Sequence, residues 1–165
     1  IEGTGVVPAE SCRRLGFVGP TARASGTSRD VRQDHPWGIH RYAHIPTATA
    51  ASGDVAGRAM VRTIEARRSI EFLTEQLATL PRGEVLATAG ALAPGELVVA
   101  LAEGWRGEIA HVAVTDAQGA VRRWKVTDPS FHDWTALAVA MAGTPISDFP
   151  LCNKSFNLSY AGHDL

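Results

Sequence analysis

Glu103-Gly104-Trp105-Arg106-Gly107-Glu108 joins two stretches of the chain that read as short strands. Residues 97–102 before it and 109–114 after it are mostly apolar and contain several valines, which is typical of strands. The two glycines let the backbone turn tightly and approach another segment, and the Arg106 guanidinium offers five donors in a fixed fork. The pattern predicts a β-hairpin whose loop suits an anion or an ion pair, with an exposed tip of no special role as the alternative.

A third strand is expected after this hairpin. The run Asp116-Ala117-Gln118-Gly119 is typical of a turn, and residues 120–126 read as a strand. Short connections of this kind join antiparallel neighbours, so we expect a small antiparallel sheet of about three strands. Val121, Trp124 and Val126 do not share one face of an unbroken strand, which predicts either a β-bulge or burial on both faces.

A long helix is predicted from Val55 to Leu80. Asp54 is suited to cap its first turn, and Pro81-Arg82-Gly83 stops it. The predicted buried stripe of this helix comprises Val61, Ile64, Phe72, Leu73, Gln76 and Leu77. The side chains expected to stay in water are Arg62, Glu65, Arg67, Glu71 and Glu75.

The remaining segments complete an α+β fold. Residues 1–53 lack sustained periodicity but contain short motifs with aromatic and charged residues. We therefore expect an ordered, extended N-terminal segment that wraps around the rest of the domain, an N-terminal wrap. A second helix begins at residues 128–130, with Asp128 or Ser130 as its cap, and runs up to Gly143. Its predicted apolar face comprises Trp134, Leu137, Ala138 and Met141. Residues 145–165 are expected to form a short helix and a packed tail, which gives a single domain over residues 1–165.

Composition and charge exclude several classes of function. The 165-residue chain has 16 basic and 17 acidic residues and a formal charge of −1, so no net field favours nucleic acid or an anionic membrane. No apolar run approaches the roughly 18 to 20 residues that span a bilayer, and no secretory signal is visible, which predicts a soluble chain. Cys12 and Cys152 are expected to be free, with a disulfide between them as the alternative.

Two clusters of polar residues are candidate sites. A dense charged cluster in the N-terminal segment is expected to form internal salt bridges, with an acidic partner as the alternative; it comprises Arg23, Arg29, Asp30 and Arg32. Three histidines, His35, His40 and His44, would form a metal site only on a regular helix, and the prolines and glycine between them argue against one.

The order of short motifs along the chain resembles one family of redox subunits. These motifs are Gly-Thr-Gly at 3–5, Gly-Pro at 19–20 with Ala-Arg-Ala-Ser-Gly at 22–26, Asp-Val-Arg at 30–32 and Gly-Asp-Val at 53–55 with Arg58, Arg62 and Glu65. Followed by the opening hexapeptide, they resemble the C-terminal half of the large subunits of membrane-bound nickel–iron hydrogenases (hydrogenase-4 and formate hydrogenlyase) and of the 49-kDa subunit of respiratory complex I. In that family the hexapeptide reads Glu-x-Pro-Arg-Gly-Glu, so Trp105 takes the place of the usual proline.

The end of the chain departs from the hydrogenase members of this family. They finish with Asp-Pro-Cys-x-x-Cys, whose thiolates hold nickel and iron. The corresponding stretch here runs from Asn157 to Gly162 and places Ser159 and Gly162 at the two cysteine positions. The resemblance therefore implies no cofactor in this chain, although family members use a nickel–iron centre or quinone. His163 with Asp164, close to these positions, is either a remnant of a proton path or an ordinary tail pair.

The resemblance implies a role in electron transfer within a larger assembly. We expect part of a hydrogenase-like or NADH:quinone oxidoreductase-like large subunit, acting as an oxidoreductase only within a complex and lacking its own nickel–iron site. A non-catalytic scaffold or assembly module that retains the fold is the alternative. Arg106 and Glu103 are the implied catalytic residues; in a chain without the metal, a structural ion pair of Arg106 with Glu103 or Glu108 is favoured.

The resemblance also implies partners and a location. These are a small subunit that carries iron–sulfur clusters, a membrane arm and the N-terminal half of the large subunit, at the cytoplasmic side of the membrane. Nucleic acid is not an expected partner. The family's first Cys-x-x-Cys precedes the part represented here, and Ile1 stands where an initiator methionine would, so a separate or trimmed piece of a large subunit is expected.

Overall fold

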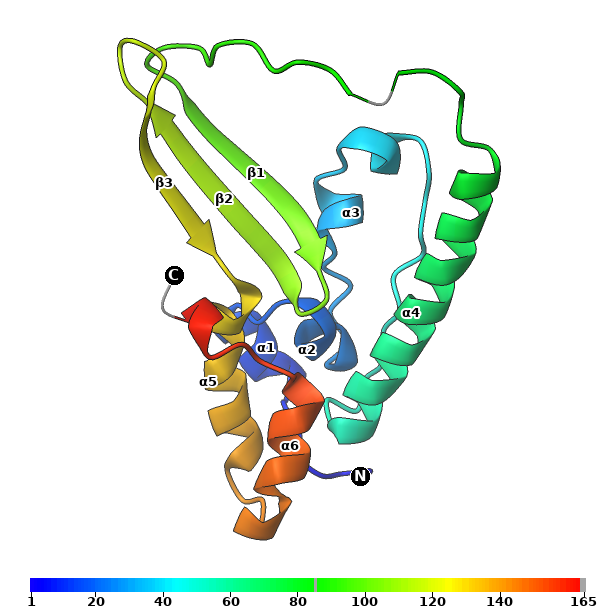
Figure 1. The fold of residues 1–165 in the computed structure, drawn as a ribbon. Coiled ribbons are helices and arrows are strands. Elements are labelled where there is room, and N and C mark those ends of the chain that lie inside the picture. The colour runs from blue at the N-terminus through cyan, green and yellow to red at the C-terminus, as the bar shows by residue number, and fades with distance from the viewer. Residues whose placement is uncertain (85, 164–165) are drawn as a thin grey trace.

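The computed structural model describes residues 1–84 and 86–163. A three-stranded antiparallel sheet and a long helix, α4 (Val55–Ala78), project from a smaller body of short helices (Figure 1). The turn that joins β1 (Leu97–Gly104) to β2 (Gly107–Thr115) meets this body, and the opposite end of the sheet points away from it. The expected α+β class is confirmed.

The sheet has the predicted strands and the predicted irregularity. Its order is β1 (Leu97–Gly104), β2 (Gly107–Thr115) and β3 (Val121–Thr127), with Glu103 opposite Glu108. Val114 pairs with Arg123 whereas Thr115 pairs with Val121, so one extra residue of β3 is accommodated in a bulge. In the turn between β2 and β3, Asp116 accepts hydrogen bonds from the backbone of Gln118 and Ala120, each at 2.9 Å.

The N-terminal segment is ordered, as expected, but more helical than an extended wrap. It contains α1 (Ala9–Leu15), α2 (Gly19–Ala24), α3 (Val31–Asp34) and the 3-10 turn η1 (Gly38–Arg41). Helices of four to seven residues are too short to leave a periodic pattern in the sequence. The segment also supplies much of the core, in which Val7, Cys12, Phe17 and Ala22 pack with Val55, Leu137, Cys152 and Phe156.

The long helix begins where the sequence predicts. Asp54 caps it by accepting a hydrogen bond from the Gly57 N–H at 2.7 Å, and the helix ends at Ala78. Its first half packs against α2 and α6 (Phe149–Phe156) and buries Val61. Its second half extends beyond the body (Figure 1), so the predicted burial of Leu73 and Leu77 is wrong.

Two polar side chains of α4 also differ from expectation. The Arg62 guanidinium donates to the backbone carbonyls of Ser155 and Phe156, and the Glu65 carboxylate pairs with Arg23. Neither side chain stays in water as predicted. Each lies in the half of α4 that other elements cover, where an ion or donor needs a partner inside the protein.

The C-terminal third forms the predicted helix and tail. Helix α5 (Pro129–Met141) is capped by Asp128, which accepts from the Ser130 N–H at 2.8 Å. Its buried residues include Asp133, Ala136, Leu137 and Ala140, whereas Ala138 is exposed, contrary to prediction. The turn η2 (Ile146–Asp148), α6 and the turn η3 (Ala161–His163) follow, and Asp164 lies outside the described residues.

Two further expectations concern cysteines and membranes. Cys12 and Cys152 are both buried and free, as predicted. Among the helices that the structure describes, none combines the length and the apolar character needed to cross a bilayer.

Candidate functional site

The tip of the β1–β2 hairpin is pressed against the start of α2. The backbone there is so close that a β-carbon on Gly19 would lie 2.1 Å from the carbonyl oxygen of Arg106. Gly19 and Gly107 both have positive φ angles, 60° and 134°, which favour glycine. Gly107 of the hairpin and Gly19 therefore permit the close approach that the sequence predicted, and α2 is the segment approached.

Buried Arg23 connects the hairpin to α4. Its side chain is 1% exposed, donates to Glu103 Oε1 at 2.8 Å, and lies 2.6 Å from Glu65 Oε1. The second oxygen of Glu103 accepts from the Val31 N–H at 3.2 Å. Burial raises the pKa of Glu103, and the nearby Arg23 charge offsets part of that effect. Glu103 is therefore fixed by two donors and faces a permanent cation.

The other charged residues of the N-terminal cluster form the expected internal salt bridges. Arg29 pairs with Glu108 at 2.7 Å, and Arg32 binds Asp30 through two nitrogens at 2.9 and 2.6 Å. Burial alone would raise the pKa of Asp30, but the hydrogen bonds and charge of Arg32, with Arg23 nearby, lower it below its usual value. Glu103 and Glu108 share one face of the sheet, each held by an arginine.

Arg106 makes neither of the ion pairs expected for it. Among the described residues, both carboxylates beside it are occupied by Arg23 and Arg29, and Arg106 takes part in no salt bridge. Its Nε instead donates to the backbone carbonyl of Asn157, at the start of the tail. The expected ion pair of Arg106 with Glu103 or Glu108 is thus wrong, and the loop arginine reaches the tail.

The tail positions that correspond to family cysteines are built into a compact turn. The Ser159 N–H donates to Ser130 Oγ at 2.9 Å, and Ser159 Oγ accepts from the Gly162 N–H at 3.0 Å. A β-carbon on Gly162 would lie 2.6 Å from the Asp128 carboxyl carbon. The turn therefore offers no thiolate, and a side chain at Gly162 would require the Asp128 carboxylate to move, so these residues as they stand do not fit a sulfur-held metal.

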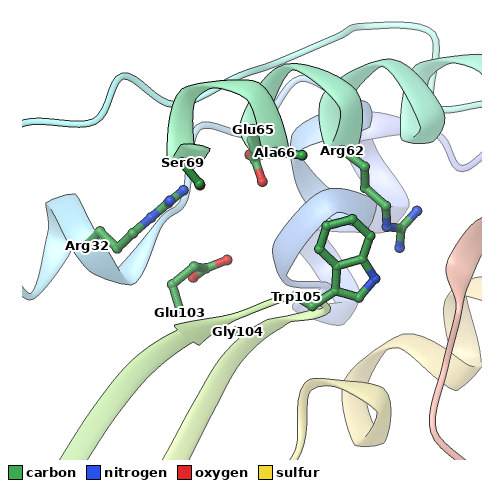
Figure 2. Close-up of a pocket in the computed structure, with 8 residues that line it drawn as sticks. All are labelled: Arg32, Arg62, Glu65, Ala66, Ser69, Glu103, Gly104 and Trp105. Carbon is green, nitrogen blue, oxygen red and sulfur yellow. The ribbon is translucent and has the colours of Figure 1, made fainter. Parts of the chain in front are cut away.

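A cavity of about 250 Å³ lies between α4 and the hairpin (Figure 2). Its lining residues are Arg32, Arg62, Glu65, Ala66, Ser69, Glu103, Gly104 and Trp105. Figure 2 shows the Glu65 and Glu103 carboxylates on facing walls. The two terminal nitrogens of Arg62 donate to the backbone carbonyls of Ser155 and Phe156. Its buried Nε has no hydrogen-bond partner among the described residues.

The sequence analysis named three ionisable residues of α4, Arg58, Arg62 and Glu65, as motif residues but did not predict that other elements cover their side chains. Arg58 is fully buried and donates to the carbonyls of Gly5 and Gly53 at 3.0 and 2.8 Å. Arg62 and Glu65 follow it at i+4 and i+7. That spacing places all three on the face of α4 that carries the buried Val61, a signal present in the sequence.

The buried face of α5 carries a further unpredicted acid, Asp133. Its side chain is fully buried and accepts from the Val18 N–H at 3.1 Å. Burial raises its pKa to about 7, against opposing contributions from Val18, Thr21 and the charges of Arg62 and Arg23. No sequence pattern marks this residue, because an isolated aspartate in a helix is ordinarily exposed.

In the part of the chain that the structure describes, His35, His40 and His44 are not grouped as metal ligands. His40 stacks on Phe72 with ring centroids 6.2 Å apart. Within residues 1–84 and 86–163, no group of three or more histidine, cysteine, aspartate or glutamate side chains is placed to hold a metal ion.

Known proteins resemble this chain in sequence over nearly its full length. The family model described as "Respiratory-chain NADH dehydrogenase, 49 Kd subunit" matches residues 1–94 and 86–164. A carbon monoxide-induced hydrogenase of Rhodospirillum rubrum is 37% identical over 155 residues, covering 94% of this chain and 43% of the relative. A subunit of the NADH-quinone oxidoreductase of Dehalococcoides mccartyi is 32% identical, covering 89% and 41%. Formate hydrogenlyase subunit 5 of Escherichia coli is 28% identical, covering 98% and 28%.

One solved structure shares the fold closely. A chain of the membrane-bound sulfane sulfur reductase, an archaeal respiratory membrane complex, matches with a TM-score of 0.90 and 22% identity. The match covers 99% of the present chain and 46% of that chain. The present chain thus spans less than half the length of the proteins it matches here.

Proposed function

Because the chain belongs to the family of the 49-kDa subunit of respiratory-chain NADH dehydrogenase, we propose that it works as the C-terminal half of a large subunit in a membrane-associated redox complex. Its relatives carry the names of a carbon monoxide-induced hydrogenase, a formate hydrogenlyase and NADH-quinone oxidoreductases. Since the chain spans less than half of these relatives, the activity and partners belong to the complete large subunit and its complex.

The contact of Arg106 with the tail carries this proposal. The hydrogen bond from Arg106 Nε to the Asn157 carbonyl joins the hairpin loop to the tail across 51 residues of sequence. Asn157 lies two residues before Ser159, which corresponds to the first cysteine of the C-terminal pair in the hydrogenase members. The chain thus retains a cation beside the tail, where negative charge that develops in a reaction would be stabilised.

We further infer that the tail of this chain holds no nickel–iron centre. Ser159 is engaged with Ser130 and with the Gly162 N–H, and Gly162 packs against Asp128. A hydroxyl is a poor ligand for a metal that prefers thiolate, and glycine contributes no side-chain ligand. Any redox centre in the complex would then be held by other chains or by the N-terminal half of the large subunit.

The two implied catalytic residues have different roles in this proposal. Arg106 is the candidate for contact with a reacting group, because it lies in the hairpin turn and its side chain reaches the tail. Glu103 is a positioning residue, because both its oxygens are already bound, one by Arg23 and one by the Val31 N–H. The partners proposed from the resemblance are a small iron–sulfur subunit and a membrane arm at the cytoplasmic side.

A non-catalytic scaffold is the second candidate, and the geometry of Gly162 favours it. A chain that fills the cysteine position by packing against Asp128 keeps the fold without the family's metal chemistry. In such a module, Arg106 would only join the hairpin to the tail.

Isolation of the intact native complex through a tag on this chain separates the two candidates. We expect an iron–sulfur subunit in the complex, together with turnover of a quinone or another electron acceptor, and substoichiometric nickel. A native complex without iron–sulfur clusters and without redox turnover would establish the scaffold. Nickel in a 1:1 ratio, lost on substitution of Ser159, would overturn the inference about the tail.

A further inference from the structure

We propose that Arg62 and Asp133 form a proton-controlled latch on the tail. While Asp133 is protonated, Arg62 holds the end of α6; when Asp133 ionises, the Arg62 guanidinium moves to its carboxylate and releases that end. The tail latch is defined as Arg62, Asp133 and the backbone carbonyls of Ser155 and Phe156. It is a conformational property of this chain and goes beyond the proposed role in a redox complex.

Arg62 holds the end of α6 with only part of its guanidinium. Its two terminal nitrogens donate to the Ser155 and Phe156 carbonyls, whereas its buried Nε has no hydrogen-bond partner among the described residues. Figure 2 shows this guanidinium pointing away from the Glu65 and Glu103 carboxylates. Within the described part of the chain, Arg62 takes part in no salt bridge. Its positive charge is therefore balanced by neutral carbonyls alone.

Asp133 is a buried acid that also lacks an ionic partner. It accepts from the Val18 N–H at 3.1 Å, and the Thr21 hydroxyl is a second donor near it. In residues 1–84 and 86–163 it forms no salt bridge. Burial raises its pKa to about 7, so it holds a proton below neutral pH and releases it above. An ionised Asp133 needs a cation, because an unpaired buried charge is strongly unfavourable.

Arg62 is the cation that responds most strongly to Asp133. Burial lowers the pKa of Arg62 to about 10, and the charge of Asp133 opposes this effect more than that of Glu65 does. The charges of Arg106 and Arg23 act in the other direction and repel Arg62. Ionisation of Asp133 therefore attracts a guanidinium that already has a nitrogen without a partner and cations beside it.

The other groups around Asp133 are committed elsewhere or uncharged. Arg23 of α2 is bound by two glutamates, and Arg58 of α4 donates to two backbone carbonyls. Burial raises the pKa of the Cys12 thiol on α1, so this group stays neutral. The elements β2, α6 and η3 also contact α5. The titratable side chains of these elements and of α5 itself affect the pKa of Asp133 less than Arg62 and Arg23 do; they are Glu108, His111, His132, Cys152, Lys154 and His163.

The energetic balance of the latch changes with the charge of Asp133. Against a protonated carboxyl group, the two carbonyls of α6 are the better partners for a guanidinium. Against a carboxylate, an ion pair in a low-dielectric interior is stronger than a contact with carbonyl dipoles. The released carbonyls belong to the C-terminal turn of a helix, where water is an ordinary partner. The hydrogen bond from Arg106 to the Asn157 carbonyl then remains as a contact between the hairpin and the tail.

Hydrogen–deuterium exchange of the full-length chain in its native complex tests the latch. The protection of amides in residues 155–163, corrected for the intrinsic pH dependence of exchange, is measured from pH 5.5 to pH 8. We expect protection in the wild type to fall at least fivefold over this range. The midpoint is expected near pH 7 or slightly below it, because the new ion pair favours the carboxylate.

Three variants assign the change to the two residues. Asp133→Asn keeps an acceptor for the Val18 N–H but cannot ionise, so its tail is expected to stay protected at every pH. Arg62→Gln keeps one donor without a charge, so its tail is expected to be less protected than the wild type at pH 5.5 and to show no pH dependence. Glu75→Gln, which changes an exposed acid of the same helix, is the matched control and is expected to respond as the wild type does.

The latch is wrong if protection in the wild type does not change with pH, or if the change persists in Asp133→Asn or Arg62→Gln. If Asp133→Asn does not fold, infrared spectroscopy of the wild type replaces it. The band of a protonated buried carboxyl group is expected to disappear at the pH at which protection falls, and a fall in protection without loss of this band overturns the proposal. Failure of the latch leaves the proposed function standing as long as the native complex retains its iron–sulfur subunit and redox turnover.

Discussion

Gly19 and Gly107 are in direct backbone contact across 88 residues of sequence. A β-carbon on Gly107 would lie 2.8 Å from both the Cα and the nitrogen of Gly19, and a β-carbon on Gly19 would lie 2.5 Å from the Cα of Gly107. This contact fixes the hairpin loop against the first turn of α2. It therefore determines where Arg106, the preceding residue, meets the tail.

Replacing Gly19 with alanine is expected to destabilise the protein by about 3 kcal/mol, because a backbone clash adds to the strain of a positive φ. Gly38→Ala is the matched control, since Gly38 has a similar φ of 55° but no atom within 4 Å of the position that a β-carbon would take. The control is expected to lose only about 1 kcal/mol. Urea denaturation measures both values. Equal losses would show that the contact between the two glycines contributes nothing.

Arg23→Leu is expected to cost about 3 to 5 kcal/mol, because it leaves the Glu103 and Glu65 carboxylates without their buried cation. The matched variant is Arg29→Leu. Arg29 also pairs with a glutamate of the hairpin, Glu108, but its side chain is 48% exposed, so we expect a loss of about 1 kcal/mol or less. Comparison of the two free energies of unfolding checks the assignment, and similar losses would contradict a special role for the buried cation.

The elements with long periodic patterns were predictable from the sequence, and the long-range polar contacts were not. The sheet, α4 and α5 follow from strand patterns, helical periodicity and the capping aspartates Asp54 and Asp128. The short helices of the N-terminal segment carry too few turns to show a period. They nevertheless supply a large part of the core.

For the candidate site, too, the sequence predicted the local backbone conformation but not the long-range polar contacts. Gly107 in the hairpin loop correctly indicated a close backbone approach, because only conformation and size were needed for that inference. The partner of Arg106 was predicted wrongly, because the nearest acids in sequence are bound by Arg23 and Arg29 from a distant segment. Local charge patterns do not reveal such competition between arginines.

The pH dependence of stability is expected to report on Asp133. Burial raises its pKa to about 7 in the folded protein, from about 3.9 in the unfolded chain. Between these values the folded state holds a proton that the unfolded state has released, so this group's contribution to stability is full below about pH 4 and is lost as the pH rises to about 7. Above that range the folded state contains a buried carboxylate with a constant penalty.

Asp133→Asn removes this titration and keeps an oxygen that can accept from the Val18 N–H. The free energy of unfolding of the variant minus that of the wild type is therefore expected to increase by about 2 to 3 kcal/mol as the pH rises from 5 to 8. Urea denaturation at the two pH values gives the difference. A constant offset between the proteins would mean that Asp133 does not titrate in this range.

Restoring cysteines to the tail is expected to be tolerated at Ser159 and not at Gly162. A sulfur atom replaces the Ser159 hydroxyl with little change in volume, so Ser159→Cys is expected to cost about 1 kcal/mol through a weaker hydrogen bond from Gly162. At Gly162 the new β-carbon would lie 2.6 Å from the carboxyl carbon of Asp128, the residue that caps α5. Displacement of that cap and repacking of the turn are expected to cost about 2 to 3 kcal/mol.

The double variant Gly162→Cys with Asp128→Ser separates the clash from other effects, because serine is smaller and still caps a helix. We expect it to recover about 1 kcal/mol or more of the loss caused by Gly162→Cys alone. Thermal and urea denaturation of the three variants measure the recovery. If Gly162→Cys is as stable as Ser159→Cys, the packing of Gly162 on Asp128 does not exclude a side chain. The inference that this packing disfavours a cysteine at position 162 would then be wrong.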